Sequence, residues 1–190
     1  MAKLIRIDSL HSGDRHKCIA NGDGFRIVVW FLGCDIRCPG CHNFDFWDFN
    51  NPNFKDFSEE DIQTIVSEME QNINIYSGLS VLGGEPFSVK NIDDAITLCK
   101  SFKEKFSEKN IWIWSGHELQ WLNSQKDEYG EKIKQLLDLC DVLVDGHFDI
   151  SRRNISLKFR GSENQIIWEK DENKNWFKSK LNNLKYLINK

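Results

Sequence analysis

Structure-breaking residues are scarce in this sequence, which has only 3 prolines and 12 glycines among its 190 residues. Hydrophobic residues nonetheless make up 40% of the chain, and charged residues 28%. This composition excludes collagen-like, low-complexity and fully disordered proteins. The length is that of one domain, or of one domain with a small appendage.

An excess of positive charge is also missing, since 25 Lys and Arg stand against 29 Asp and Glu and give a net charge of -4. Such a chain has no global basic field to attract nucleic acid, and we expect no nucleic-acid partner. The longest stretch without a polar residue, 27–34, is far too short to cross a membrane. The first eight residues lack the apolar core of a signal peptide. We therefore expect a cytoplasmic protein with no membrane partner.

Strand-like and helix-like segments alternate along the chain. The segments rich in β-branched and aromatic residues predict strands at 25–32, 79–82, 111–114 and 142–144, and the segments between them predict helices at 58–71, from 91 to 106 and within 117–139. The last three strands begin 32 and 31 residues apart, which is about the length of a βαβ unit. We expect an α/β fold of parallel strands, either an open sheet or a partial barrel, with ligands at the carboxyl ends of the strands.

Two helix starts carry capping signals. Ser58 and Asp61 suit a capping box, and Asn91 can cap the second helix. Apolar residues that share one face of that second helix are Ile92, Ala95, Ile96, Cys99, Phe102 and Phe106. Cys99 on this face, and Cys140 at the end of the next helical region, are expected to be small core residues.

Three of the six cysteines lie within eight residues, whereas Cys18, Cys99 and Cys140 are scattered. In a chain of this size without an export signal, such a group indicates a metal or cluster site rather than disulfides. The group is Cys34, Cys38 and Cys41, in C-x3-C-x2-C spacing directly after a predicted strand. A structural zinc site needs four ligands, so zinc would require His42 or a distant cysteine as the fourth. Three thiolates on a 4Fe–4S cluster leave one iron open to another ligand.

This cysteine spacing after the first strand resembles that of the radical S-adenosylmethionine (SAM) enzymes. Residues 82–86, Leu-Gly-Gly-Glu-Pro, resemble the GGEP motif of the same superfamily. The resemblance implies a partial TIM-like barrel of parallel βα units over residues 1–168, a 4Fe–4S cluster on Cys34, Cys38 and Cys41, and SAM as cofactor. It also implies the SAM-side residues Gly40, Cys41, His42, Gly83, Gly84, Glu85 and Ser115, with the backbone around Gly84 touching the amino group of SAM. No catalytic residue beyond these ligands is expected, because hydrogen-atom transfer needs no general acid or base.

Further segments resemble those of one subgroup, the activating proteins of anaerobic (class III) ribonucleotide reductase. These segments are 21–26, 111–116, 141–148 and 159–165. The resemblance implies a radical SAM oxidoreductase that cleaves SAM reductively and generates a glycyl radical on the large subunit of that reductase. A flavodoxin- or ferredoxin-type protein is the implied electron donor. The chain departs from the subgroup in a longer lead-in at 11–20 and in the extension after Trp168.

Several alternatives stay open on the sequence alone. The same chemistry could serve another glycyl-radical enzyme or a small molecule, as in 7-carboxy-7-deazaguanine synthase, or the chain could be a non-catalytic zinc-binding interaction module. The basic segment 169–190 suits either an amphipathic helix packed on the domain or a docking element. The aromatic residues Phe44, Phe46, Trp47 and Phe49 suit core, cluster shield or docking patch. Trp114 suits either core or ligand site, and Asp145 and His147 are expected to face solvent or a partner.

Overall fold

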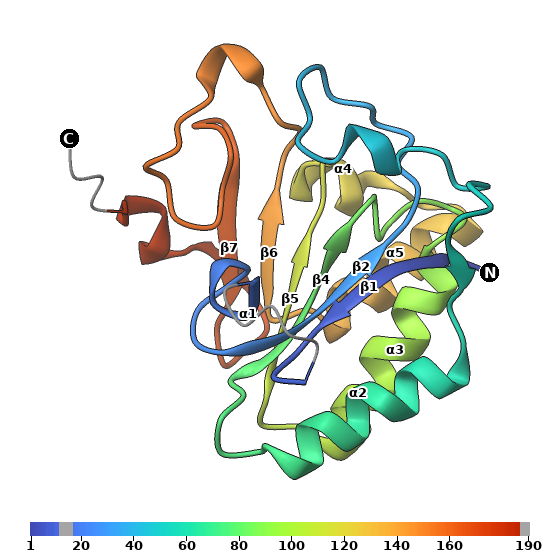
Figure 1. The fold of residues 1–190 in the computed structure, drawn as a ribbon. Helices are drawn as coiled ribbons and strands as arrows, with labels where there is room; N and C mark the ends of the chain where they lie inside the picture. Colours follow the sequence, from blue (N-terminus) through green and yellow to red (C-terminus); the bar gives the residue numbers. More distant parts are fainter. Residues whose placement is uncertain (12–16, 187–190) are drawn as a thin grey trace.

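The computed structural model describes residues 1–11 and 17–186 (Figure 1). Its strands are β1 Lys3–Asp8, β2 Arg26–Phe31, β3 Lys55–Asp56, β4 Gly78–Gly83, β5 Asn110–Trp114, β6 Val142–Asp145, β7 Ile166–Lys170 and β8 Trp176–Lys178. Its α-helices are α1 Lys17–Ala20, α2 Glu59–Gln71, α3 Ile92–Lys105, α4 Leu119–Ser124 and α5 Glu128–Leu139. Short 3-10 helices form at Phe44–Phe46, Ile150–Arg152 and Lys180–Asn183. Within these described ranges, no helix is long and apolar enough to span a bilayer.

All eight strands belong to one mixed sheet with the order β3-β1-β2-β4-β5-β6-β7-β8. The four strands predicted from the sequence, β2, β4, β5 and β6, are neighbours and run parallel, as expected. The four strands that the sequence analysis missed flank them in antiparallel pairing, β1 and β3 on one side and β7 and β8 on the other. The fold is therefore α/β, and the centre of its sheet is parallel. That the sheet is an incomplete barrel stays a prediction.

Both faces of the parallel strands are buried, which explains why their sequences are continuous hydrophobic runs. In β2, Ile27, Val29 and Phe31 point into the large core under the helices, whereas Val28 and Trp30 point to the opposite face. Helices α2, α3 and α5 cover the first face (Figure 1). The loops after β2 and β6 lie together at the top of the view, where the parallel strands end (Figure 1).

Of the two predicted helix N-caps, the one at Ser58 is confirmed and the one at Asn91 is corrected. Ser58 and Asp61 form the expected capping box at the start of α2. Asn91 stands at the N-cap of α3, but its side chain makes no cap hydrogen bond. It is fully buried and donates instead to carbonyl groups of neighbouring loops. The six apolar residues predicted for the inner face of this helix are all in the core.

Up to residue 186, where the described part of the C-terminal segment ends, no α-helix forms. Residues 166–178 make the antiparallel pair β7 and β8, and Lys180–Asn183 make a 3-10 helix. In this hairpin Lys170 lies over the ring of Trp176 and Lys178 over the ring of Trp168, so lysines and aromatic side chains pair across the two strands. Strand β7 runs across residue 168, the boundary expected between domain and extension, and that division stays a prediction. Residues 12–16 of the expected long lead-in lie outside the described residues.

Candidate functional site

The three clustered cysteines line a single cavity of about 310 Å³ at the carboxyl end of the parallel strands. Cys34, Cys38 and Cys41 are each half-buried. Strand β2 ends at Phe31, and Gly33, two residues later, has a φ of +92° in the region that favours glycine. A Cβ there would lie 1.9 Å from the ring of Phe49, so the loop can fold back on itself only because this residue has no side chain.

Backbone N–H groups point at the thiols. Burial raises the pKa of Cys34 to about 11, and a hydrogen bond from the backbone of Arg37 opposes that shift. Burial likewise raises the pKa of Cys38, against a hydrogen bond from the backbone of Phe148. The N–H of Asn43 donates to Sγ of Cys41 at 3.4 Å. At Cys34 and Cys38 the donors favour the thiolate, which is the metal-ligating form, whereas burial raises the pKa of both thiols.

The geometry of the donor set fits a cluster better than a single ion. Across residues 1–11 and 17–186, no three His, Cys, Asp or Glu side chains converge closely enough to hold one metal ion. A structural zinc site needs four ligands around one point. In a four-iron cluster each thiolate binds a different iron, so the thiolates must surround one cavity without meeting at a point. The three half-buried thiols meet this second requirement.

The Gly83–Gly84–Glu85 loop is pressed against the cysteine loop. The N–H of Gly84 donates to the carbonyl of Phe31 at 2.7 Å, and the N–H of Glu85 donates to the carbonyl of Gly33 at 2.8 Å. A Cβ on Gly84 would lie 2.0 Å from that Gly33 oxygen. Glycine is thus required here for contact between two backbones. The expected contact of the Gly84 backbone with SAM stays a prediction.

Glu85 is a buried carboxylate that fastens two loops. It is 1% exposed, and it accepts hydrogen bonds from Ser115 Oγ at 3.0 Å, the N–H of Gly116 at 2.8 Å and the N–H of Phe87 at 3.0 Å. Burial raises its pKa to about 7 even though these donors lower it. Glu85 and Ser115, both expected beside SAM, therefore hold each other at the edge of the cavity.

Asn91 is a site residue that sequence reasoning assigned only to helix capping. Its amide donates to the carbonyls of Leu32 at 3.0 Å, Gly33 at 3.3 Å and Glu85 at 3.0 Å. The side chain of Asn91 therefore connects the cysteine loop to the glycine loop by hydrogen bonds. The only sequence signal was a polar residue directly before an apolar helix face, which has many simpler explanations.

The loop after β6 forms the remaining wall of the cavity. Phe148 lines it, and Ile150 packs on Gly40, where a Cβ would lie 2.6 Å from the isoleucine side chain. Gln165 braces this loop: its amide donates to the carbonyl of Gly146 at 2.9 Å and its oxygen accepts from the N–H of Gly161 at 2.8 Å. The sequence marked these segments only by resemblance, because hydrogen bonds between distant loops leave no periodic pattern.

A larger groove of about 1000 Å³ adjoins the cavity. The residues that line both are Asn21, Cys41, His42, Asn43, Trp114, Phe148 and Gln165. Every residue predicted beside SAM lines one of the two: Gly40 the groove, Cys41 and His42 both, and Gly83, Gly84, Glu85 and Ser115 the cavity. The residues predicted to contact SAM therefore line two adjoining hollows.

Comparison with known proteins identifies the family of this chain. Residues 20–168 match the family described as a 4Fe-4S single cluster domain. The chain is 32% identical over 149 residues to the anaerobic ribonucleoside-triphosphate reductase-activating proteins of Escherichia coli K12 and Salmonella typhimurium, covering 78% of this chain and 91% of each relative. The protein of that name from Enterobacteria phage T4 is 32% identical over 152 residues, with 78% and 86% covered. The chain belongs to the family of anaerobic ribonucleoside-triphosphate reductase-activating proteins.

The predictions for the remaining cysteines and for Asp145 and His147 have mixed outcomes. Cys99 and Cys140 are fully buried, as predicted for core residues. Cys18, which the sequence left without a role, is also fully buried, in α1. Asp145 was expected to face solvent or a partner, but it is 3% exposed and accepts a hydrogen bond from the N–H of Leu119 at 2.7 Å. His147 is exposed, as expected.

The aromatic residues after the cysteine loop do not form core in this family member. Phe44 is 59% exposed, whereas Phe46, Trp47 and Phe49 are half-buried. Phe49 packs directly on Gly33, the residue before the first cysteine. Trp114 faces the cavity and the groove, and its Nε1 donates to the carbonyl of Phe159 at 2.9 Å. It belongs to the site rather than to the main core.

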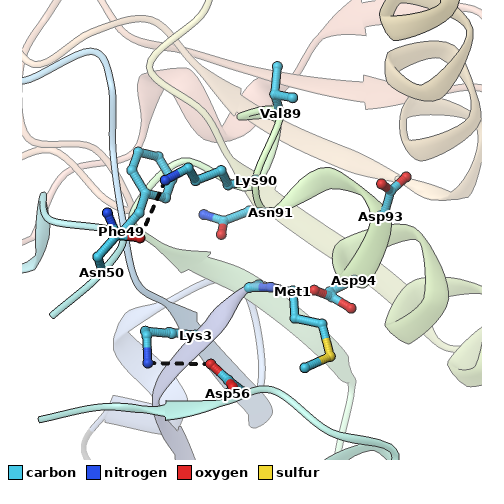
Figure 2. Close-up of a pocket in the computed structure, with 11 residues that line it drawn as sticks. Met1, Lys3, Phe49, Asn50, Asp56, Val89, Lys90, Asn91, Asp93 and Asp94 are labelled. Atoms are coloured by element: carbon cyan, nitrogen blue, oxygen red, sulfur yellow. Dashed lines mark hydrogen bonds and ion pairs between the residues drawn. The ribbon is translucent and has the colours of Figure 1, made fainter. Parts of the chain in front are cut away.

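A second cavity of about 650 Å³ lies near the N-terminus and shares no lining residue with the cysteine cavity (Figure 2). Two pairs of its polar groups bond to each other, Lys3 with Asp56 at 3.3 Å and Lys90 with Asn50 at 3.4 Å. Lys90 also lies 5.2 Å from the ring centre of Phe49. Among the described residues, no cysteine lines this cavity.

Proposed function

We propose that the protein is a radical SAM activase of anaerobic ribonucleotide reductase. Cys34, Cys38 and Cys41 would hold a 4Fe–4S cluster, and this cluster together with SAM would supply the one-electron chemistry by which a hydrogen atom is removed from a glycine Cα of the reductase, with methionine, 5′-deoxyadenosine and a glycyl radical as products. The observation that carries the proposal is the set of three half-buried thiols around one cavity in a chain of this family.

The residues of the chain position and shield the reacting groups in this proposal. The cysteine loop and the glycine loop are held together by backbone hydrogen bonds and by Asn91, so the cavity exists before any ligand enters. Phe148 and Trp114 give the cavity apolar walls, which limit the access of water to a reactive radical. Gly40, Cys41 and His42 border the passage into the groove, where SAM would meet the partner protein.

The partners and surroundings follow from the same proposal. The reductase supplies the glycine, and a flavodoxin- or ferredoxin-type protein supplies the electron. All six cysteines are free, which suits the reducing conditions of the cytoplasm. We further propose that the sheet is an incomplete barrel whose open side admits a polypeptide, because the parallel strands end at one shared hollow.

Product analysis under anaerobic conditions tests the function directly. The protein is reconstituted with iron and sulfide and mixed with dithionite, SAM and the anaerobic reductase of the same organism. We expect 5′-deoxyadenosine together with a glycyl EPR doublet on the reductase, and neither with Cys38→Ala. Deoxyadenosine without the doublet would assign the radical to another substrate. A preparation that binds zinc and no iron would return the chain to the interaction-module alternative.

A further inference from the structure

The C-terminal segment folds back onto the groove. Tyr186 lines the groove, and its N–H donates to the carbonyl of Ser156 at 2.6 Å. The N–H of Lys158 donates to the carbonyl of Leu184 at 3.4 Å, and Leu157 and Lys185 form a β-bridge. Leu184, Lys185 and Tyr186 lie beyond position 168, where the match to the 4Fe-4S family ends. Tyr186, outside the matched family region, therefore contributes to one wall of the groove.

This wall is anchored rather than loosely attached. Asn182 exchanges two hydrogen bonds with the backbone of Ile167 in β7, at 2.9 and 2.8 Å. Arg160 donates to the carbonyl of Asn182 at 2.7 Å and to that of Gln165 at 2.8 Å. Gln165 itself lines both the groove and the cysteine cavity. Hydrogen bonds of Arg160 therefore connect the C-terminal segment to Gln165 at the cysteine cavity.

The groove presents apolar side chains to the solvent. Ile19 is 54% exposed, Ile150 is 54%, Ile155 is 65% and Tyr186 is 42%. Large apolar side chains gathered around one hollow mark an interaction surface. They come from three segments far apart in the sequence, around residue 19, at 150–155 and at 186. Such a surface fits side chains of an extended polypeptide better than a polar metabolite.

Among the residues that the structure describes, the charged side chains that line the groove are Arg153 and Arg160, and no Asp or Glu lines it. Arg160 is engaged with backbone carbonyls, whereas the guanidinium of Arg153 is exposed. Within the part of the chain that the structure describes, the Arg153 side chain has no ion-pair or hydrogen-bond partner. Its neighbour Arg152 is paired with Asp149 at 2.7 Å. A carboxylate from outside the chain would complement Arg153.

We propose that this groove, with Tyr186 of the C-terminal segment in one wall, binds an extended segment of the reductase that carries apolar side chains and a carboxylate opposite Arg153. The inference rests on the proposed function, since it names how the protein substrate of that reaction is held. It adds a role for the part of the chain beyond the matched family region. In this arrangement the bound segment runs past His42 and Cys41 toward the cysteine cavity.

Two aromatic residues of the C-terminal region provide a matched test. Tyr186 is 42% exposed in the groove, and Phe177 is 43% exposed on β8, away from it. We expect Tyr186→Ala to raise the KM for the reductase about tenfold, the size of one good aromatic contact, with kcat changed less than twofold. Phe177→Ala should leave the KM unchanged. Equal KM values for the two variants would overturn the proposed wall.

Two neighbouring arginines test the charge. We expect Arg153→Gln to raise the KM several-fold at low salt and to flatten its dependence on salt, because an exposed ion pair weakens as salt is added. Arg152→Gln removes the same charge outside the groove and should keep the salt dependence of the wild type. If both variants behave alike, no carboxylate faces Arg153.

The failure of this inference can be told from the failure of the proposed function. Wild-type protein that cleaves SAM but yields no glycyl radical would contradict the function. Wild-type protein that yields the radical, with normal KM values in Tyr186→Ala and Arg153→Gln, would contradict only the groove. Circular dichroism melting of each variant, compared with wild type, separates lost binding from lost folding.

Discussion

Ser115 and Glu85 are bonded side chain to side chain, with Ser115 Oγ donating to Glu85 Oε1 at 3.0 Å. The second carboxylate oxygen accepts from the N–H of Gly116 at 2.8 Å. The backbone N–H of Glu85 in turn holds the carbonyl of Gly33 at 2.8 Å. The ends of β2, β4 and β5 are thereby joined through one buried residue. The cavity is preorganised by protein contacts, which is what accurate placement of reacting groups requires.

The buried carboxyl of Glu85 should make stability depend on pH. Burial raises its pKa from 4.5 to about 7. Between these values the folded protein retains a proton that the unfolded chain has released, so the unfolding free energy should fall as the pH rises. The expected fall is on the order of 3 kcal/mol from this group. Denaturant unfolding of the cluster-free protein at several pH values from 4.5 to 7.5 measures it.

Glu85→Gln identifies the residue responsible. The amide cannot titrate, so the fall in unfolding free energy across this pH range should shrink in the variant. Glu104→Gln, at an exposed position of α3, is the matched control and should keep the wild-type slope. A Glu85→Gln protein with an unchanged slope would mean that another group is responsible.

Gly84→Ala should remove the cluster without touching a ligand. The new Cβ would lie 2.0 Å from the carbonyl oxygen of Gly33, and neither backbone can yield cheaply. We expect iron and sulfide content after reconstitution to fall to less than about a third of wild type, with an unfolding free energy lower by about 2–4 kcal/mol. Gly161→Ala is the control, since its Cβ would meet side chains and no backbone, with Phe148 at 3.0 Å and Gln165 at 3.6 Å. Normal iron content in Gly84→Ala would show that the two loops can separate.

Metal analysis should divide the cysteines into two classes. Replacement of Cys34, Cys38 or Cys41 by Ala should abolish cluster binding, because each thiol lines the cavity. Cys99→Ala removes a fully buried thiol from the helix face of α3 and should keep the full iron content, at a cost of about 1 kcal/mol in stability. Iron retained in Cys38→Ala, or lost in Cys99→Ala, would refute the assignment of ligands.

The parallel centre of the sheet could be predicted because each strand is a hydrophobic run whose pattern depends only on burial. The strands β1, β3, β7 and β8 could not, since they are short or half-exposed and owe their structure to pairing with distant segments. The cysteine ligands were visible as a local spacing. The roles of Asn91 and Gln165 were not, because their partners lie in other loops and no local pattern records such bonds.

Asn91 offers the sharpest test of the idea that the loops are held before the cluster binds. Its amide donates to three buried carbonyls, and Asn91→Ala would leave them short of donors. Loss of these bonds should lower the unfolding free energy of the cluster-free protein by about 2–3 kcal/mol. It should also slow cluster uptake, because the cysteine loop would have to be ordered during binding. Asn72→Ala, at the end of α2 and far from the cysteines in the sequence, removes a similar amide and should leave uptake unchanged. If Asn91→Ala is destabilised but takes up iron at the wild-type rate, the bonds stabilise the fold without preparing the site.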